Sequence, residues 1–524
     1  MITITEKNLT LKGDCAFADF QLDAYAQLEI KLDIEHAAEI ELVLGEVAEQ
    51  NKINREPGGY RIVRSMKKSC PAGKSSFAFE LPEHCSPYHY TNSVSLPPEA
   101  ENNPITPFRY VEINGGTGKA TLVRKAIYGE FDDNASDFKS DNPTLNRIWE
   151  FCKYTMKATA AFGLYIDGER ERQPYEGDAL INQLGDLCSG GSAETARKTI
   201  NWLIETPTHF TEWQLITPIL ARDYLLYTGD KKSCQKWLPA LEKQIRKYCV
   251  REDNLLHQPD YMRKLGDTAL VIKDLIDWPI SERDNYDFQD VNLVPNCCYY
   301  ASLLAMYEIS GKESYKTAAD AVKKAINEKL VKNNMPVDSL DSTHTALHSL
   351  FYPVYCKVMP LSDNMAEIIR RKGMSCSVYM AQYLLEMCFD NGMEDHAFKL
   401  LLSKELRSYS NMIAKGATMA MESWDDSCKP NQDWNHAWGA APANLIPRCI
   451  AGIKPLEAGF KKFSVTPHPG KLQEFYMKHP TPNGSIILKY KNNTFALTVP
   501  EGSIAVTSQG ELPAGKYIGL DLKA

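Results

Sequence analysis

Five carboxylates and two arginines lie within the twelve residues from Asp167 to Asp178. Pro174 and the two glycines of this run, Gly168 and Gly177, prevent a continuous helix, so the acids are expected on a bent loop. Crowded carboxylates raise one another's pKa, whereas neighbouring guanidinium groups lower it. Such a loop can hold one protonated acid beside others that stay ionised, as acid–base catalysis requires. The same composition also suits a solvated loop without a catalytic role, so this run alone does not decide the function.

A second segment, residues 417–440, combines acids, amides and tryptophans. Glu422 follows Met421 and stands two residues before Trp424, and a carboxylate in such apolar surroundings is normally desolvated and perturbed. Three of the chain's eight tryptophans, Trp424, Trp434 and Trp438, fall within fifteen residues. Aromatic rings beside acids and amides suit a sugar, whose C–H face stacks while its hydroxyl groups form hydrogen bonds. An aromatic core cluster beside a loop is the alternative interpretation.

The two acid-bearing segments are about 250 residues apart and suggest the two-carboxylate mechanism of glycoside hydrolases. In that mechanism one group protonates the leaving oxygen while the other activates water. Inversion requires roughly 6.5–9.5 Å between the two groups, and retention roughly 5–5.5 Å. The sequence predicts the pair of acids but not their separation.

The bulk composition argues against several classes of partner. A net charge of −8 without a basic tract makes a nucleic acid or an anionic membrane an unfavourable partner. No apolar run approaches the roughly 18–20 residues that span a bilayer, and the first residues lack the pattern of a signal peptide. We therefore expect a cytoplasmic protein, or a periplasmic one if an export signal has been removed. Fourteen cysteines without a Cys-x-x-Cys pair favour buried thiols, and we expect neither a metal nor a cofactor.

Three segments with different hydrophobic periods must position the two acids. Residues 1–138 alternate apolar and polar positions and predict an N-terminal β-sandwich. Residues 139–455 take a helical period after Asn142 and Pro143, which suit a helix N-cap and the first helical position. Residues 456–524 return to short alternating stretches and predict a smaller C-terminal β domain.

Three helix ends in the middle segment resemble one another. Gly229, Gly311 and Gly392 stand 82 and 81 residues apart, and each is placed to end a helix in the left-handed conformation. These spacings are close to the length of two helical hairpins. Roughly twelve helices in such pairs predict a mainly α catalytic domain, a closed (α/α)6 toroid, between the two β domains.

Through these residues the chain resembles the bacterial α-L-rhamnosidases of glycoside hydrolase family 78 over nearly its whole length. In the family's first signature a Glu-Arg pair precedes Gly-Asp-Ala, and Glu171-Arg172 and Gly177-Asp178-Ala179 match it at the same spacing. Asp167 matches the leading Asp of that signature after a deletion. The second signature is matched by Glu422, Trp424 and the run from Asn435 to Gly439.

The resemblance implies an inverting hydrolase that acts on terminal α-L-rhamnose, with a rhamnose-containing glycan or glycoside as its partner. A homodimer is a possible assembly that the sequence does not decide. Glu171 would be the general acid and Glu422 the general base. The predicted sugar-binding residues, which include the tryptophans of residues 417–440, are Asp167, Arg172, Tyr175, Asp178, Trp213, Asp277, Trp278, Trp424, Trp434, His436 and Trp438.

The chain departs from the family pattern inside the first signature. The deletion after Asp167 and the additional Glu169 leave the general acid open between Glu171 and Glu169. Tyr175 stands where the family has Trp and Pro174 where it has Gly, which suits a sugar related to rhamnose as well as rhamnose itself.

Two other functions fit the same residues. A toroid glycosidase or lyase of different sugar specificity is one, although an acid-rich pocket would repel the uronate that a lyase needs. A non-catalytic glycan-binding protein with the same aromatic cavity is the other. Loss of turnover in Glu171→Gln and Glu422→Gln variants would separate an enzyme from a binding protein.

Overall fold

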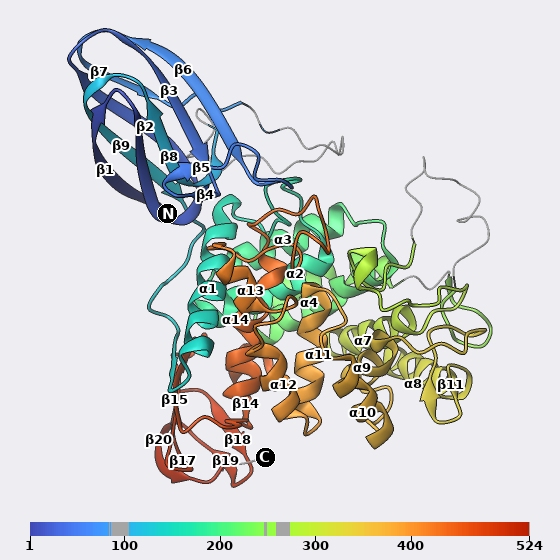
Figure 1. The fold of residues 1–524 in the computed structure, drawn as a ribbon. Helices are drawn as coiled ribbons and strands as arrows, with labels where there is room; N and C mark the ends of the chain where they lie inside the picture. Colours follow the sequence, from blue (N-terminus) through green and yellow to red (C-terminus); the bar gives the residue numbers. More distant parts are fainter. Residues whose placement is uncertain (83, 85–103, 246–248, 258–272, 523–524) are drawn as a thin grey trace.

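The computed structural model describes residues 1–82, 84, 104–245, 249–257 and 273–522. Figure 1 shows a helical domain in the centre, a β domain from the N-terminal residues at one end and smaller β sheets from the C-terminal residues at the other. The expected fold class, a six-hairpin helical domain between β structures, is confirmed.

The N-terminal strands form two layers that share one long strand. They are β1 (Ile2–Lys12), β2 (Cys15–Ile34), β3 (Ala38–Gly45), β6 (Val63–Cys70), β7 (Gly73–Ala78), β8 (Thr106–Asn114) and β9 (Thr117–Ile127), with the short pair β4 (Ala48–Glu49) and β5 (Lys52–Ile53). The first half of β2 pairs with β8, and its second half pairs with β9 and β7. The pairing shifts between Asp19 and Ala24, where Gln21 takes a positive φ of 71° and β2 passes from one layer to the other. One apolar core lies between the layers.

The middle of the chain folds into a ring of paired helices. Its helices are α1 (Pro143–Thr159), α2 (Glu176–Ser189), α3 (Ala193–Glu205), α4 (Thr211–Thr228), α5 (Lys231–Gln244), α7 (Leu293–Ser310), α8 (Glu313–Lys329), α9 (Leu347–Tyr355), α10 (Asp363–Lys372), α11 (Val378–Asp390), α12 (Glu394–Leu401), α13 (Tyr409–Ala414) and α14 (Pro442–Leu445). Helices α2, α4, α7, α9, α11 and α14 contact one another in turn, and α14 returns to α2. Almost every residue of α2 and α11 is buried, whereas α3, α8 and α10 bury one stripe, as expected for inner and outer helices.

The predicted helix ends are confirmed. Asn142 caps α1 by accepting a hydrogen bond from the backbone of Leu145 at 3.1 Å. Gly229 and Gly311 follow α4 and α7 with φ values of 77° and 69°, and Gly392 follows α11 with a φ of 69°. A glycine adopts this conformation without the steric cost that a Cβ brings, so each helix stops where the sequence indicates.

The C-terminal residues form two small sheets against the ring. Their strands are β13 (Ile453–Pro455), β14 (Lys462–Val465), β15 (Glu474–His479), β16 (Ile486–Lys491), β17 (Thr494–Val499), β18 (Ile504–Thr507), β19 (Gly510–Leu512) and β20 (Gly515–Leu520). Strand β10 (Asp137–Ser140), which precedes α1, pairs with β15 and so belongs to these sheets. The first expected domain boundary, at residue 138, therefore falls inside β10. The division into 1–138, 139–455 and 456–524 stays a prediction.

Two further expectations concern the cysteines and membrane-spanning helices. Each cysteine in the described part of the chain is a free thiol, and most of these thiols are buried. Within the same residues, no helix combines the length and apolarity needed to cross a membrane.

Buried acids join the N-terminal β domain to the helical ring. The backbone N–H of Asp23 donates to Thr418 Oγ1 at 2.8 Å, and Glu46 Oε1 accepts from Asn435 Nδ2 at 3.1 Å. Burial raises the pKa of Asp23 to about 6. Burial and the neighbouring charge of Asp23 raise the pKa of Glu46 well above its usual range. Two carboxyls that cannot both ionise are thus placed at the domain contact.

We expect this contact to make stability depend on pH. An acid whose folded-state pKa is raised stabilises the fold below its unfolded pKa, and it loses that contribution as pH rises toward the folded value of about 6. The free energy of unfolding of Asp23→Asn minus that of wild type should therefore be larger at about pH 7 than at about pH 4, by on the order of 1–3 kcal/mol. Urea unfolding at both pH values measures the gain. Asp14→Asn, an exposed acid of the same domain, is the control, and an equal difference at both pH values would contradict the assignment.

Candidate active site

The acid loop, residues 167–175, is a compact turn that leads into α2. Asp167 and Gln173 exchange hydrogen bonds across it, from Asp167 N to Gln173 O at 2.9 Å and from Gln173 N to Asp167 Oδ1 at 2.8 Å. Arg172 takes a positive φ of 51°, which is strained for a residue with a side chain. A Cβ at Gly168 would collide with the carboxylate of Asp433, so the loop can approach the second segment only with glycine there.

The tryptophan loop, residues 415–436, follows α13 and precedes the short helix η5 (Ala437–Ala440). The backbone N–H of Glu422 donates to Asp433 O at 3.2 Å, and that of His436 donates to Ala420 O at 2.9 Å. Trp438 Nε1 donates to Glu422 O at 2.9 Å. These contacts fold the loop back on itself and present Glu422, which is 1% exposed, to the acid loop.

Arg170 joins the two loops. Its Nη2 lies 3.1 Å from Glu171 Oε1 and 2.7 Å from Glu422 Oε1, so these two oxygens are at most about 5.8 Å apart, the sum of the two contacts. Arg170 Nη1 also donates to Glu422 Oε2 at 2.6 Å, which makes the pairing with Glu422 bidentate. Lys429 Nζ approaches Glu422 Oε1 at 3.3 Å. The two expected acids therefore meet at one place, with a shared cation between them.

A protonated histidine lies beside this pair. His436 Nε2 is 2.8 Å from Asp178 Oδ1, and its Nδ1 is 3.0 Å from Asp433 Oδ1. Burial lowers the pKa of His436, but the charges and hydrogen bonds of Asp433 and Asp178 outweigh burial and hold that pKa well above its usual range. The imidazolium therefore donates to both carboxylates and fixes Asp178 at the cavity wall.

Asp167 is the carboxyl of this cavity that most strongly retains a proton. Burial, and then the charge of Glu171, raise the pKa of Asp167 well above its usual range. Among the described residues its Oδ1 accepts from Gln173, whereas its Oδ2 forms no hydrogen bond. Glu171 accepts a short hydrogen bond from the Tyr175 hydroxyl in addition to Arg170. The charge of Glu171 thus favours a proton on the neighbouring Asp167.

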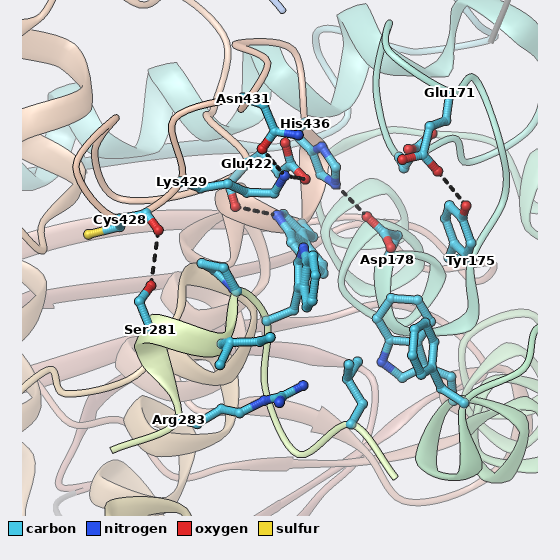
Figure 2. A pocket seen from close by; sticks show the side chains of 18 of the residues that line it. Glu171, Tyr175, Asp178, Ser281, Arg283, Glu422, Cys428, Lys429, Asn431 and His436 are labelled. Atoms are coloured by element: carbon cyan, nitrogen blue, oxygen red, sulfur yellow. Dashed lines mark hydrogen bonds and ion pairs between the residues drawn. The ribbon is translucent and has the colours of Figure 1, made fainter. Parts of the chain in front are cut away.

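The two loops and the inner helices enclose a cavity of about 850 Å³. Figure 2 shows Glu171, Tyr175 and Asp178 on one side of it and Glu422 and His436 on the adjoining side. Nine of the predicted residues line this cavity: Asp167, Glu171, Tyr175, Asp178, Trp213, Trp278, Glu422, His436 and Trp438. The rings of Trp213 and Trp438 meet edge to face, with centroids 6.4 Å apart, and form an aromatic wall.

Four residues predicted to contact the sugar do not line the cavity, and that expectation is corrected. Arg172 turns toward the N-terminal domain, where it pairs with Glu169 at 2.8 Å and donates to Ile105 O at 2.7 Å. Asp277 is fully buried and is bound by His348 at 2.7 Å and by Ser377. Trp424 is fully buried and donates to Cys376 O at 2.8 Å, and Trp434 packs beneath the guanidinium of Arg61.

Sequence reasoning missed the cations that organise the site. Arg170 stands between Glu169 and Glu171, and the sequence does not show toward which acid it turns. Lys429 and Asp433 lie in the tryptophan loop and carry no motif of their own. A count of charges in the two segments could have indicated these cations, because several buried acids need cations nearby.

Glu422, Asp433 and His436 bring ligand atoms within 4.8 Å of one another, a spacing that a metal ion can bridge. Each of the three is already engaged in an ion pair. Glu422 pairs with Arg170 and Lys429, and Asp433 pairs with His436. These cations compete with a divalent ion for the same oxygens and repel it, so the donor set does not fit a metal.

Asn435 ties the acid loop to the N-terminal domain. Its Oδ1 accepts from the backbone N–H of Glu169 at 2.7 Å and from the Tyr25 hydroxyl at 3.2 Å. Its Nδ2 donates to Glu46. One buried amide of the tryptophan loop thus contacts both the acid loop and two residues of the β domain.

Comparison with known proteins identifies relatives of both the ring and the last sheets. Residues 133–450, more than half of the chain, match the family described as the bacterial alpha-L-rhamnosidase six-hairpin glycosidase domain. Residues 452–508 match the bacterial alpha-L-rhamnosidase C-terminal domain. An alpha-L-rhamnosidase of Streptomyces avermitilis is 22% identical over 400 residues, which cover 69% of this chain and 37% of that protein.

Solved structures show the same fold at low identity. An α-L-rhamnosidase of Aspergillus terreus superposes with a TM-score of 0.76 at 16% identity, over 98% of this chain and 63% of that one. The Streptomyces avermitilis α-L-rhamnosidase complexed with L-rhamnose superposes with a TM-score of 0.72 at 16% identity, over 98% of this chain and 53% of that one. This chain therefore spans little more than a third of the curated relative and less than two thirds of these structures.

We expect the Arg170 bridge to dominate the stability of the two loops. Arg170→Met leaves buried carboxylates without their shared cation and should lower the free energy of unfolding by about 3–5 kcal/mol at neutral pH. The loss should shrink as pH falls, because protonated carboxyls need no counter-ion. Chemical denaturation at several pH values measures both effects. Arg197→Met, which removes an exposed pair with Glu194 on α3, is the matched control and should cost less than about 1 kcal/mol.

Proposed function

The chain belongs to the bacterial α-L-rhamnosidase family with a six-hairpin glycosidase domain, and we propose that it is a glycoside hydrolase that releases terminal α-L-rhamnose, or a closely related sugar, from oligosaccharides or glycosides. The observation that carries the proposal is the meeting of Glu171 and Glu422 at Arg170, on the wall of one aromatic-lined cavity. Two carboxylates facing one cavity are the chemical requirement of glycoside hydrolysis.

We propose that the Asp167–Glu171 pair supplies the proton and that Glu171 delivers it. Glu171 lines the cavity, whereas Glu169 is paired with Arg172 behind it, which supports Glu171 as the donor. The raised pKa of Asp167 favours retention of a proton next to Glu171. That proton is the one the leaving oxygen needs.

Glu422 is the proposed general base. It forms ion pairs with Arg170 and Lys429, and a base must be ionised to remove a proton from water. The limit of about 5.8 Å concerns one oxygen of each carboxylate while Arg170 binds both. Inversion needs a carboxyl separation of about 6.5–9.5 Å, so we propose that a bound sugar takes over part of the Arg170 contact to Glu171 and opens room for water.

The remaining cavity residues are proposed to hold the sugar. Asp178, fixed by His436, and the free oxygen of Asp167 can form hydrogen bonds with ring hydroxyls. Trp213, Trp438 and Tyr175 offer apolar surface for the C–H face. Trp278 lines the same cavity and is proposed to contact the leaving group.

Two expectations about partners stay predictions alongside this proposal. They are the possible homodimer and the absence of a nucleic-acid partner. Size-exclusion chromatography with light scattering would test the first.

The decisive experiment is turnover of an aryl α-L-rhamnoside. We expect the wild-type chain to release L-rhamnose, and Glu171→Gln and Glu422→Gln each to lower kcat/KM by about 10²–10⁴-fold, because each removes one half of the acid–base pair. Glu194→Gln, an exposed glutamate on α3, is the matched control. Proton NMR of the first product should show the β-anomer. The α-anomer would overturn inversion, and wild-type inactivity on a panel of aryl glycosides would overturn the hydrolase.

The pH profile tests the shared proton. Activity requires a protonated pair and should fall as pH rises through the pKa of that pair. Asp167→Asn removes the carboxyl on which burial and the charge of Glu171 favour a proton, so the basic limb of kcat/KM should move to lower pH. The profiles of wild type, Asp167→Asn and Glu194→Gln make the comparison, and an unmoved basic limb in Asp167→Asn would count against the pair.

A further inference from the structure

The cavity continues well beyond the carboxylates. Its volume of about 850 Å³ is near the upper end of the roughly 300–1,000 Å³ of ligand pockets, which leaves room for more than one sugar ring. Lys273, Arg283 and Phe288 line the outer part. Figure 2 shows Arg283 across the cavity from Glu171, with its side chain reaching into the open space.

Arg283 enters the cavity without a carboxylate partner. Its Nε donates to Asp277 O at 2.9 Å, and its guanidinium lies over the Phe288 ring, 5.0 Å from the centroid. Within the part of the chain that the structure describes, Nη1 and Nη2 form no hydrogen bond or ion pair. The backbone carbonyl and the ring therefore fix the guanidinium while its two outer nitrogens face the cavity.

Asp277 and Glu212 act on Arg283 through their charges, but neither forms an ion pair with it among the described residues, and other acids close to it in the chain are engaged elsewhere. The pairs are Glu282 with Arg407 at 2.7 Å, Asp284 with Lys372 at 2.6 Å and Asp277 with His348 at 2.7 Å. Burial lowers the pKa of Arg283, which is the direction for a cation that is taken from water without a close counter-ion. A partly desolvated guanidinium with two open donors is suited to bind an anion.

We infer that the outer part of the cavity is a subsite for a leaving group with a carboxylate, so that the terminal sugar is cleaved from a hexuronate residue. The inference rests on the proposed function, which places the terminal sugar among the acids. The planar fork of Arg283 matches a carboxylate with two parallel hydrogen bonds. Lys273, which forms no ion pair among the described residues, adds a second positive charge to the lining of the cavity, while Asp274 is bound by Asn292 at 2.8 Å.

This proposed division of charge also bears on an earlier expectation. The acid-rich run of the sequence suggested that the pocket repels a uronate. Asp167, Glu171, Asp178 and Glu422 line the part of the cavity where the terminal sugar is proposed to bind, whereas Lys273 and Arg283, which form no ion pair among the described residues, line another part together with Asp274. A uronate is thus disfavoured in one part of the cavity and favoured in the other.

The experiment compares three substrates that differ only in the leaving group: α-L-rhamnosyl-(1→4)-D-glucuronate, its methyl ester and the corresponding D-glucose disaccharide. We expect wild-type kcat/KM for the uronate to exceed the other two by at least about tenfold, as a charge-assisted pair implies. Arg283→Met should bring the ratio toward one, and Arg283→Lys should keep part of it. Arg197→Met is the matched control and should leave the ratio unchanged. Ratios within one variant cancel general effects on folding.

Failure of this inference and failure of the proposed function are distinguishable. Equal kcat/KM for the three substrates in the wild type, or an unchanged ratio in Arg283→Met, would overturn the uronate subsite while leaving the hydrolase intact. Inactivity on every rhamnoside would overturn the proposed function. In that case, calorimetry can compare the affinities for D-glucuronate and D-glucose and so test the subsite without turnover. A preference for glucuronate that depends on Arg283 would support the subsite, and equal affinities would overturn it.

Discussion

The contact of Arg170 with Glu171 and Glu422 is the interaction on which the arrangement of the site depends. Two carboxylates brought within about 5.8 Å in a buried place repel each other strongly unless a cation lies between them. Desolvating that cation is costly too, and Arg170 offsets the cost with a further hydrogen bond to the Asn431 carbonyl at 2.9 Å. This charge balance holds the two loops together along with the hydrogen bond from the backbone of Glu169 to Asn435.

The same balance explains which parts of the site the sequence could predict. Glu171 and Glu422 were recognisable because acids in a broken loop and an acid among tryptophans are both unusual. The direction of Arg170 was not, because it depends on Glu422, about 250 residues away. Arg172 was assigned to the sugar on the basis of its place in a signature, but its positive φ turns it toward Glu169 and the β domain.

The fold was easier to predict than the lining of the cavity. Gly229, Gly311 and Gly392 end helices by a local property, the freedom to adopt positive φ, and local properties are visible in a sequence. Trp424 and Trp434 lie in the same segment as Trp438 and look alike in the sequence. Trp424, however, is bound to Cys376, and Trp434 packs against Arg61 of the N-terminal domain. Which face of a loop meets the cavity is a tertiary property, and no period in the sequence encodes it.

The pairing of β10 with β15 has a consequence for how the chain reaches its fold. Asp137, just before the first helix, pairs with Lys478, well after the last one, so this sheet fastens the two ends of the ring. Helical hairpins form from contacts between near neighbours, whereas this pairing requires the closure of a loop of more than 300 residues. During synthesis this pairing can therefore form only after β15 has left the ribosome, later than the contact of α14 with α2 that closes the ring of helices.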